Sequence, residues 1–345
     1  MPIASKRGPY RKVASRMPAV PVVDIGAIYG QAPDALAKTA REFGAAFERF
    51  GFATIVGHGV PPATIASAYK AGNAFFDLPL AHKLASTVPD RVKGRGFVPA
   101  GVESVARTLG SDRPPDLVEA LVFGSMQDET LPLPLGAASA ATGNLFPAEP
   151  AELGPAFHAY FMAMRELSGT LMRLAAVALD LPADYFAPYI DRRRGTLRAA
   201  FYPEQNDPPA PGQLRYGAHT DYGGFTILRQ DDAPGGLQVD LDGNWIDVAP
   251  MPGAFVINIG DLVSRWTNGR WRSTLHRVVN PPRDTHASTR RLSLVFFSGP
   301  NDDAVIECLP TCRGPERPAQ YPPVVARDYI RAKLDSSMPT TLERR

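Results

Sequence analysis

The chain has 345 residues, of which 44% are hydrophobic and 21% are charged, so it is long enough to bury one large core or two ordinary ones. Its 37 basic and 35 acidic side chains nearly balance, and a net charge of +2 excludes the concentrated positive field that usually binds nucleic acids and acidic membranes. Cys308 and Cys312, the two cysteines of the chain, are too few for a disulfide framework, which favours a reducing, cytoplasmic location.

The chain begins with a basic segment, residues 1–18, that contains no acidic residue. This segment lacks the apolar run of a signal peptide, and Pro2, Gly8 and Pro9 oppose the amphipathic helix of a transit peptide. We therefore expect a disordered tail. No later segment approaches the roughly 18 apolar residues that a membrane span requires.

Residues 19–195 are predicted to be largely helical. Between residues 33 and 51, apolar side chains recur at three- and four-residue spacings, and Gly51 is a natural end for this helix. The other predicted elements of this region are a short strand over 52–60, helices over 61–79 and 156–181, and a loop rich in Pro, Gly and Ala over 131–155.

From Thr196 the pattern changes to short segments rich in β-branched and aromatic residues, separated by turn residues. About eight such segments precede residue 310: 197–203, 225–231, 236–241, 244–250, 254–261, 272–279, 291–299 and 304–310. This density is typical of a jelly roll. The expected fold is therefore α+β with a mainly β core, a double-stranded β-helix over 196–310 that the N-terminal helices support.

The histidine and aspartate of "AHTDYGG" lie two residues apart in an extended segment, so His219 and Asp221 face the same way. A third ligand must come from another strand, and His276 in "RSTLHRVV" is the candidate. Two imidazoles and one carboxylate with open positions are typical of non-haem Fe(II) that activates oxygen. The same donors could also hold the zinc of a hydrolase.

A second polar pair, Arg291 and Ser293 in "RRLSLVFF", shares one face of a predicted strand. A guanidinium and a hydroxyl together fit a carboxylate, and an arginine in a β core is costly to bury without an anion. Two alternatives remain open: Arg291 pairs with an internal acid, or Arg290 is the residue that points inward. The apolar Leu292 between the two polar residues favours Arg291 with Ser293.

The segments "HTD", "STLHRVV" and "RLS" together resemble the iron(II)/2-oxoglutarate-dependent oxygenases of the isopenicillin N synthase-like group. The resemblance runs from about Val20 to the end of the chain. Its other matches are "VPVVDIG", "REFGAAFERFGFATIVGHGV", "AFFDLPLAHK", "PPDLVEALVFG", "VINIGDLVSRWTNGRWRSTLHRVV" and "FFSGPNDDAVIECLP".

The resemblance implies a role for each of these residues. His219, Asp221 and His276 would hold the catalytic Fe(II), and Arg291 with Ser293 would bind the distal carboxylate of 2-oxoglutarate. Tyr202 of "FYP" matches a tyrosine that contacts this cosubstrate in many relatives, although a core role for it is equally compatible with the sequence. Two departures are Ala200 and Gly57, where relatives often carry Asn, and neither position ligates iron.

The implied reaction consumes O2 and 2-oxoglutarate, releases succinate and CO2, and hydroxylates, desaturates or cyclises a small organic substrate through an iron(IV)-oxo intermediate. The alternatives are an iron-dependent oxidase of the isopenicillin N synthase type that uses no 2-oxoglutarate, a zinc-dependent hydrolase and a non-catalytic binding protein. We expect a small-molecule substrate, no nucleic-acid or membrane partner, and a monomer or weak homo-oligomer.

Relatives also suggest which segments surround the substrate. Residues 311–345 are expected to form a C-terminal tail that packs near the active site. Candidate pocket residues are Phe97, Val122, Leu214, Leu228 and Trp266. The other histidines are not expected to bind the metal: His58 is interpreted as a turn or packing residue, His82 and His158 lie in predicted helices, and His286 lies in a loop. Tight turns account for Asn258, Asp261 and Asn268.

Overall fold

The computed structural model describes residues 19–30, 34–88, 95–111, 113–126, 144–192 and 194–337. The expected tail over 1–18 and residues 131–143 of the expected loop lie outside the described residues. No helix among the described residues is both long and apolar enough to cross a membrane.

In the described part of the chain, the largest sheet has eight strands in the order β1-β2-β10-β7-β12-β5-β4-β3. Their bounds are β1 Val22–Asp24, β2 Phe52–Val56, β3 Gly96–Val98, β4 Glu119–Phe123, β5 Gly195–Tyr202, β7 Phe225–Gln230, β10 Phe255–Ile259 and β12 Arg291–Ser298. Apart from the parallel pair β1 and β2, neighbouring strands of this sheet run antiparallel.

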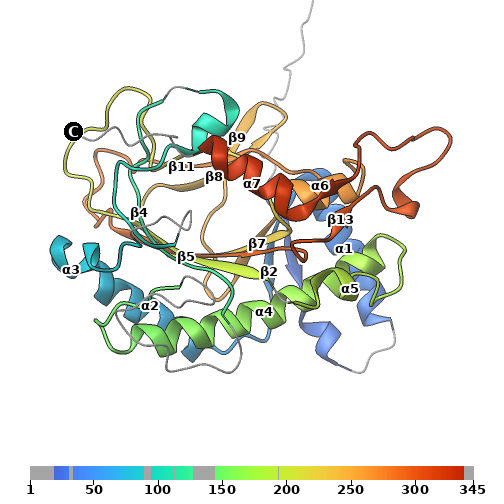
Figure 1. Cartoon of the computed structure of the whole chain (residues 1–345), viewed down its shortest axis with the longest axis horizontal. Coiled ribbons are helices and arrows are strands. Elements are labelled where there is room, and N and C mark those ends of the chain that lie inside the picture. The colour runs from blue at the N-terminus through green and yellow to red at the C-terminus, as the bar shows by residue number, and fades with distance from the viewer. Residues whose placement is uncertain are drawn as a thin grey trace, which may run out of the picture.

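A second sheet of four strands, ordered β6-β11-β8-β9, faces the first across the core (Figure 1). Its strands are β6 Tyr216–His219, β8 Gly236–Leu241, β9 Asn244–Asp247 and β11 His276–Val279. A short pair completes the described strands, β13 Val305–Ile306 with β14 Val324–Val325. Each segment predicted as a strand after Thr196 contains one, and the jelly roll is confirmed.

Three helices, α1 Ala35–Arg49, α2 Pro62–Phe76 and α4 Leu153–Ala178, pack on the outer face of the large sheet (Figure 1). Figure 1 shows α4 running beneath β5 and β7, with β8, β9 and β11 on the opposite side of the sheet. The shorter helices are η1 Gly26–Tyr29, α3 Leu80–Leu84, η2 Val105–Leu109, α5 Ala187–Ile190, α6 Asp261–Trp266 and η3 Pro310–Cys312, and the C-terminal helix is α7 Ala326–Ser337.

The apolar stripe of α1 explains how this helix is held. Phe43 and Phe47 are fully buried, and their rings meet edge to face with centroids 4.5 Å apart. Burial of each ring contributes about 2 kcal/mol. Gly51 follows the helix with φ +68°, and a Cβ there would lie 2.2 Å from the carbonyl oxygen of Arg272, so only glycine fits this close approach.

Strands from before residue 195 extend the large sheet on both sides. β2 pairs with β10, and β4 pairs with β5. The sequence did not predict β1, β3 or β4 as strands, because they are short and β4 is buried on both faces, so it lacks alternation. The division into 19–195, 196–310 and 311–345 stays a prediction.

Candidate metal centre

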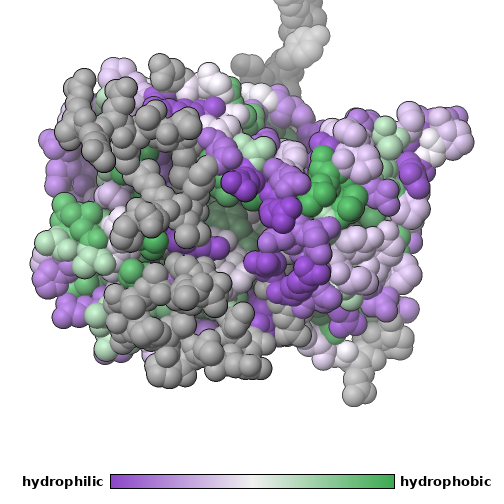
Figure 2. Space-filling model, viewed as in Figure 1, coloured by the Kyte–Doolittle hydropathy of each residue, from purple (hydrophilic) through white to green (hydrophobic). Residues whose placement is uncertain are grey.

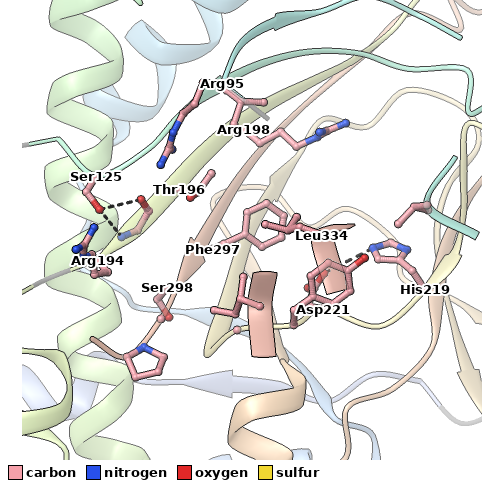
Figure 3. A pocket seen from close by; sticks show the side chains of 18 of the residues that line it. Arg95, Ser125, Arg194, Thr196, Arg198, His219, Asp221, Phe297, Ser298 and Leu334 are labelled. Carbon is pink, nitrogen blue, oxygen red and sulfur yellow. Dashed lines mark hydrogen bonds and ion pairs between the residues drawn. The ribbon is translucent and has the colours of Figure 1, made fainter. Parts of the chain in front are cut away.

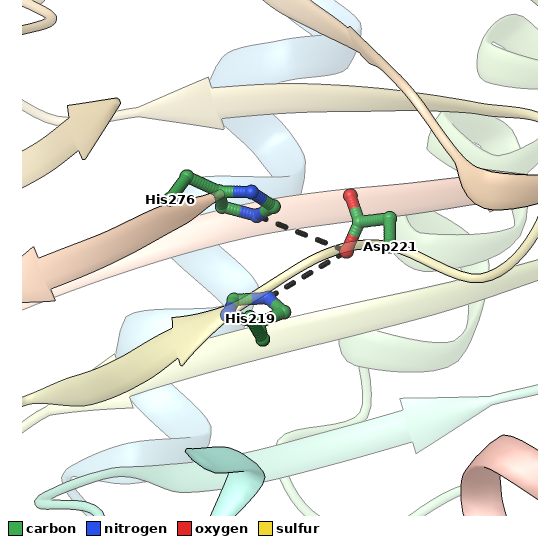
Figure 4. A group of neighbouring side chains, drawn as sticks. All are labelled: His219, Asp221 and His276. Atoms are coloured by element: carbon green, nitrogen blue, oxygen red, sulfur yellow. Dashed lines mark ion pairs between the residues drawn. The ribbon is translucent and has the colours of Figure 1, made fainter. Parts of the chain in front are cut away.

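His219 and His276 lie directly opposite each other on neighbouring antiparallel strands, β6 and β11. Their ring centroids are 4.2 Å apart. Asp221 follows β6 by two residues, and its Oδ1 lies 3.6 Å from Nε2 of His219 and 3.8 Å from Nε2 of His276 (Figure 4). The three side chains are buried, and their ligand atoms all lie within 4.8 Å of one another.

Backbone carbonyl groups fix the tautomers of both imidazoles. Nδ1 of His219 lies 2.9 Å from the carbonyl oxygen of Gly217, and Nδ1 of His276 lies 3.1 Å from that of Thr274. A carbonyl oxygen can only accept, so Nδ1 carries the proton in each ring and donates it. The Nε2 lone pairs are therefore left facing Asp221, as metal ligands require.

The carboxylate of Asp221 is held through its other oxygen. Thr226 donates its hydroxyl to Oδ2 at 2.5 Å, and Asn258 donates its side-chain amide to the same atom at 2.6 Å. These two residues face each other on β7 and β10. The interpretation of Asn258 as a turn residue was wrong, since it lies within a central strand and orients the carboxylate, which leaves Oδ1 for the two imidazoles.

The protonation states of Asp221 and His276 favour a cation between them. Burial alone would raise the pKa of Asp221, but His276 and His219 outweigh burial and hold that pKa below its usual range. Burial, with His219 beside it, lowers the pKa of His276 to about 4. Near neutral pH the site thus offers a carboxylate and a neutral His276, and this donor set fits Fe(II).

The variant Asn258→Ala should bind iron roughly 10- to 100-fold more weakly, because Asp221 loses one of the two hydrogen bonds that orient it. Anaerobic competition for Fe(II) with a chelator measures this affinity. Asn244→Ala, in an exposed position of β9, is the matched control and should retain wild-type affinity. Equal affinities in the two variants would show that Asn258 does not position the carboxylate.

The structure places Arg291 inside the jelly roll and Arg290 outside it. Arg291 is 2% exposed on β12 and lies opposite Tyr202 of β5, whereas Arg290 pairs with Asp77. Ser293 is buried on the same face as Arg291, while Leu292 faces the helices beside Gly72. The prediction that Arg291 and Ser293 share the inward face of this strand therefore agrees with the geometry.

The guanidinium of Arg291 is fixed by groups at the end of β7. Nη2 donates to the side-chain oxygen of Gln230 at 2.7 Å, and Nη1 donates to the carbonyl of Ala233 at 2.8 Å. Asp231 lies 3.7 Å from Nη1, so an internal acid is also close to this arginine. The carboxylate of Asp231 itself accepts the backbone N–H of Leu292 at 2.7 Å.

A second buried cation, Arg215, lies in the same region and was not predicted. It is 1% exposed, and its guanidinium carbon lies 5.6 Å from the ring centroid of Tyr202. Burial, with Arg291 nearby, lowers the pKa of Arg215 to about 10, and burial raises that of Tyr202 to about 12. Two cations and a protonated hydroxyl group therefore gather here, which fits an anionic ligand.

Alternation along β6 was the signal that could have revealed Arg215. Arg215, Gly217 and His219 are all buried and separated by two residues, so they share the face that carries the metal ligand. Arg215 lies one residue before the first residue of β6.

A cavity of about 370 Å³ adjoins His219 and Asp221. Of the five pocket candidates, Val122 lines it, whereas Phe97 and Trp266 lie in the main hydrophobic core. Leu214 and Leu228 are not among the lining residues. Two residues of α7, Ile330 and Leu334, complete one wall. Figure 2 shows a hollow with an apolar floor beside the hydrophilic surface of α7.

Comparison with known proteins agrees with this geometry. Residues 194–300 match the 2OG-Fe(II) oxygenase superfamily, and residues 20–149 match the N-terminal region of non-haem dioxygenases in morphine synthesis. The 2-oxoglutarate-Fe(II) type oxidoreductase hxnY of Emericella nidulans is 32% identical over 326 residues, which cover 92% of this chain and 90% of that protein. The chain belongs to the 2OG-Fe(II) oxygenase superfamily. This oxygenase is an Fe(II)- and 2-oxoglutarate-dependent dioxygenase.

Other relatives of the oxygenase span much of its length. Gibberellin 20 oxidase 2 of Oryza sativa subsp. indica is 34% identical over 314 residues, which cover 90% of this chain and 75% of that protein. The crystal structure of a full-length Neurospora crassa protein in complex with alpha-KG has a TM-score of 0.80 at 28% identity, over 91% of this chain and 95% of that one. JOX2 in complex with 2OG, Fe and JA has a TM-score of 0.72 at 26% identity, over 95% of this chain and 92% of that one.

Proposed function

We propose that His219 and His276 bind Fe(II) through Nε2 and that Asp221 binds it through Oδ1. The observation that carries this assignment is the convergence of these three atoms. The other nitrogen of each imidazole is hydrogen-bonded to the carbonyl of Gly217 or Thr274, and the other carboxylate oxygen accepts from Thr226 and Asn258. Side chains held in this way converge before the metal arrives, so little reorganisation opposes binding.

We further propose that Arg291, with Ser293, binds the distal carboxylate of 2-oxoglutarate. Tyr202 and Arg215 support this proposal, because they add a hydroxyl donor and a second positive charge beside Arg291. Arg291 lies on the large sheet and the proposed iron ligands lie on or next to the small one. A cosubstrate bound to both would therefore lie between the sheets.

Bound Fe(II) supplies the redox chemistry by which O2 and 2-oxoglutarate become succinate and CO2, with one oxygen atom left to oxidise the substrate. The protein orients the reactants and limits the access of water. His219 and Asp221 line the cavity of about 370 Å³, a size suited to a small molecule. We propose that the substrate lies there, with the carbon to be oxidised directed toward these two residues.

We also propose that the protein works in a reducing compartment such as the cytoplasm. Cys308 and Cys312 support this proposal, because both are buried free thiols.

Succinate formation tests the proposed function directly. The purified chain, supplied with Fe(II) and 2-oxoglutarate, should form succinate slowly without added substrate, only in the presence of O2, and His276→Ala should not. Zn(II) in place of Fe(II) should give no succinate. Consumption of O2 without succinate would indicate the oxidase alternative, and turnover with Zn(II) under anaerobic conditions would indicate a hydrolase.

A further inference from the structure

Three basic and three acidic side chains line the cavity, and two of the basic ones form ion pairs with two of these acids. Arg198 pairs with Glu103 through both carboxylate oxygens, at 3.0 and 2.5 Å, and is therefore neutralised. Arg194 pairs with Asp302 at 2.9 Å. Arg95 also lines the cavity, and no ion pair links it to an acid in the described part of the chain.

Arg95 is partly buried, and its Nε is a buried donor with no hydrogen-bond partner among the described residues. Burial, with Arg194 nearby, lowers the pKa of Arg95 from the usual value of an arginine, as expected for a cation without an adjacent acid. A partly buried guanidinium without an acid beside it is costly, so this side of the cavity is suited to an anion that pairs with it.

Gly124, which follows β4, provides the space in which the Arg95 guanidinium lies. A Cβ at Gly124 would be 1.8 Å from Cζ and Nη1 of Arg95. Any side chain at residue 124 would therefore displace the guanidinium. The position of this charge depends on glycine at residue 124 as well as on arginine at residue 95.

The iron site does not supply the missing negative charge. Fe(II) carries two positive charges, Asp221 supplies one negative charge, and the carboxylate of 2-oxoglutarate next to its keto group supplies the second. The imidazoles of His219 and His276 add none when they are neutral. Since no acid of the described segments pairs with Arg95, its unit charge is left for the substrate.

We infer that the substrate is an organic anion of the carboxylate class, whose carboxylate binds Arg95. Figure 3 shows Arg95 on the opposite side of the cavity from His219 and Asp221. A carboxylate on Arg95 thus directs the rest of the molecule across the cavity toward the proposed iron ligands. Its body would contact the apolar residues that line the cavity: Val105, Val122, Phe297, Ile330 and Leu334. The inference rests on the proposed function, because it names the substrate of the same site.

Matched acid and amide probes test the inference. Phenylacetate, 3-phenylpropanoate and 4-phenylbutanoate are each compared with their primary amide by anaerobic calorimetry on the full chain. Fe(II) and saturating 2-oxoglutarate are present, so that the cosubstrate's own carboxylate sites are filled. At least one acid should bind at least about 10-fold more tightly than its amide, because a charge-assisted hydrogen bond is stronger than a neutral one.

Two variants remove this preference in different ways. Arg95→Gln removes the charge, and Gly124→Ala keeps the charge but displaces it. Both should reduce the ratio of acid to amide affinity to about one. Arg192→Gln is the matched control, since it removes the same charge from an exposed pair with Asp303 outside the cavity lining, and it should keep the wild-type ratio.

Three results would overturn the inference: equal binding of acid and amide to the wild type, no binding of any probe, or an acid preference that persists in Arg95→Gln. The proposed function is checked separately by titrating 2-oxoglutarate into the wild-type chain with Fe(II). Failure to bind 2-oxoglutarate would contradict the proposed function, whereas normal binding of 2-oxoglutarate without an acid preference would contradict only the substrate class.

Discussion

His219→Ala, Asp221→Ala and His276→Ala should each abolish succinate formation and lower the affinity for Fe(II) by at least about 100-fold, more than the loss of a supporting hydrogen bond causes. The physical reason is that the three ligand atoms converge within 4.8 Å, and two donors cannot hold the metal as three do. Metal analysis after anaerobic loading measures occupancy, and circular dichroism measures whether the fold is preserved.

The fold should persist in these variants, because none of the three ligands belongs to the main hydrophobic core or to the smaller apolar cluster between the sheets. His82→Ala is the matched control, since His82 is an exposed histidine of α3 that pairs with Glu149. It should keep full iron content and turnover. Full iron content and wild-type turnover in His276→Ala would contradict the assignment of the metal ligands.

Arg291→Ala should raise the apparent Michaelis constant for 2-oxoglutarate at least about 30-fold, since loss of one partner from a buried charge pair costs about 2–5 kcal/mol. Arg291 is 2% exposed, so water cannot easily take the place of its side chain. The constant is measured from initial rates of succinate formation at varied 2-oxoglutarate and saturating Fe(II).

Arg290→Ala is a closely matched control for this prediction. It removes the same side chain one residue earlier, but Arg290 points outward and pairs with Asp77, so the constant for 2-oxoglutarate should stay within about twofold of the wild type. An unchanged constant in Arg291→Ala would place the cosubstrate carboxylate elsewhere. The neighbouring Arg215 would then be the first residue to test, because it is equally buried.

Local sequence patterns predicted much of the fold. The long helices α1, α2 and α4 follow from apolar spacings, and the jelly-roll strands follow from β-branched and aromatic segments between turn residues. The strands β1, β3 and β4 could not be predicted from such local patterns. They are short, and whether such a segment pairs depends on a neighbouring strand that is distant in the sequence.

The sequence by itself determined the chemistry of the candidate metal site. The two-residue spacing of His219 and Asp221 and the alternation of Arg291 with Ser293 are properties of one extended segment each, so no tertiary information is needed to see them. His276 required only the expectation of a jelly roll, whose strands return to the same place.

Only the tertiary structure decided which residues support these groups and which charge remains for the substrate. Asn258 reaches Asp221 from β10, Arg215 lies beside Tyr202, and Arg95 lies over Gly124. Each of these contacts joins different segments of the chain, and a contact made from a strand depends on strand register, because a shift of one residue would turn the side chain to the opposite face. Register is set by the packing of the whole core, and no local pattern contains it.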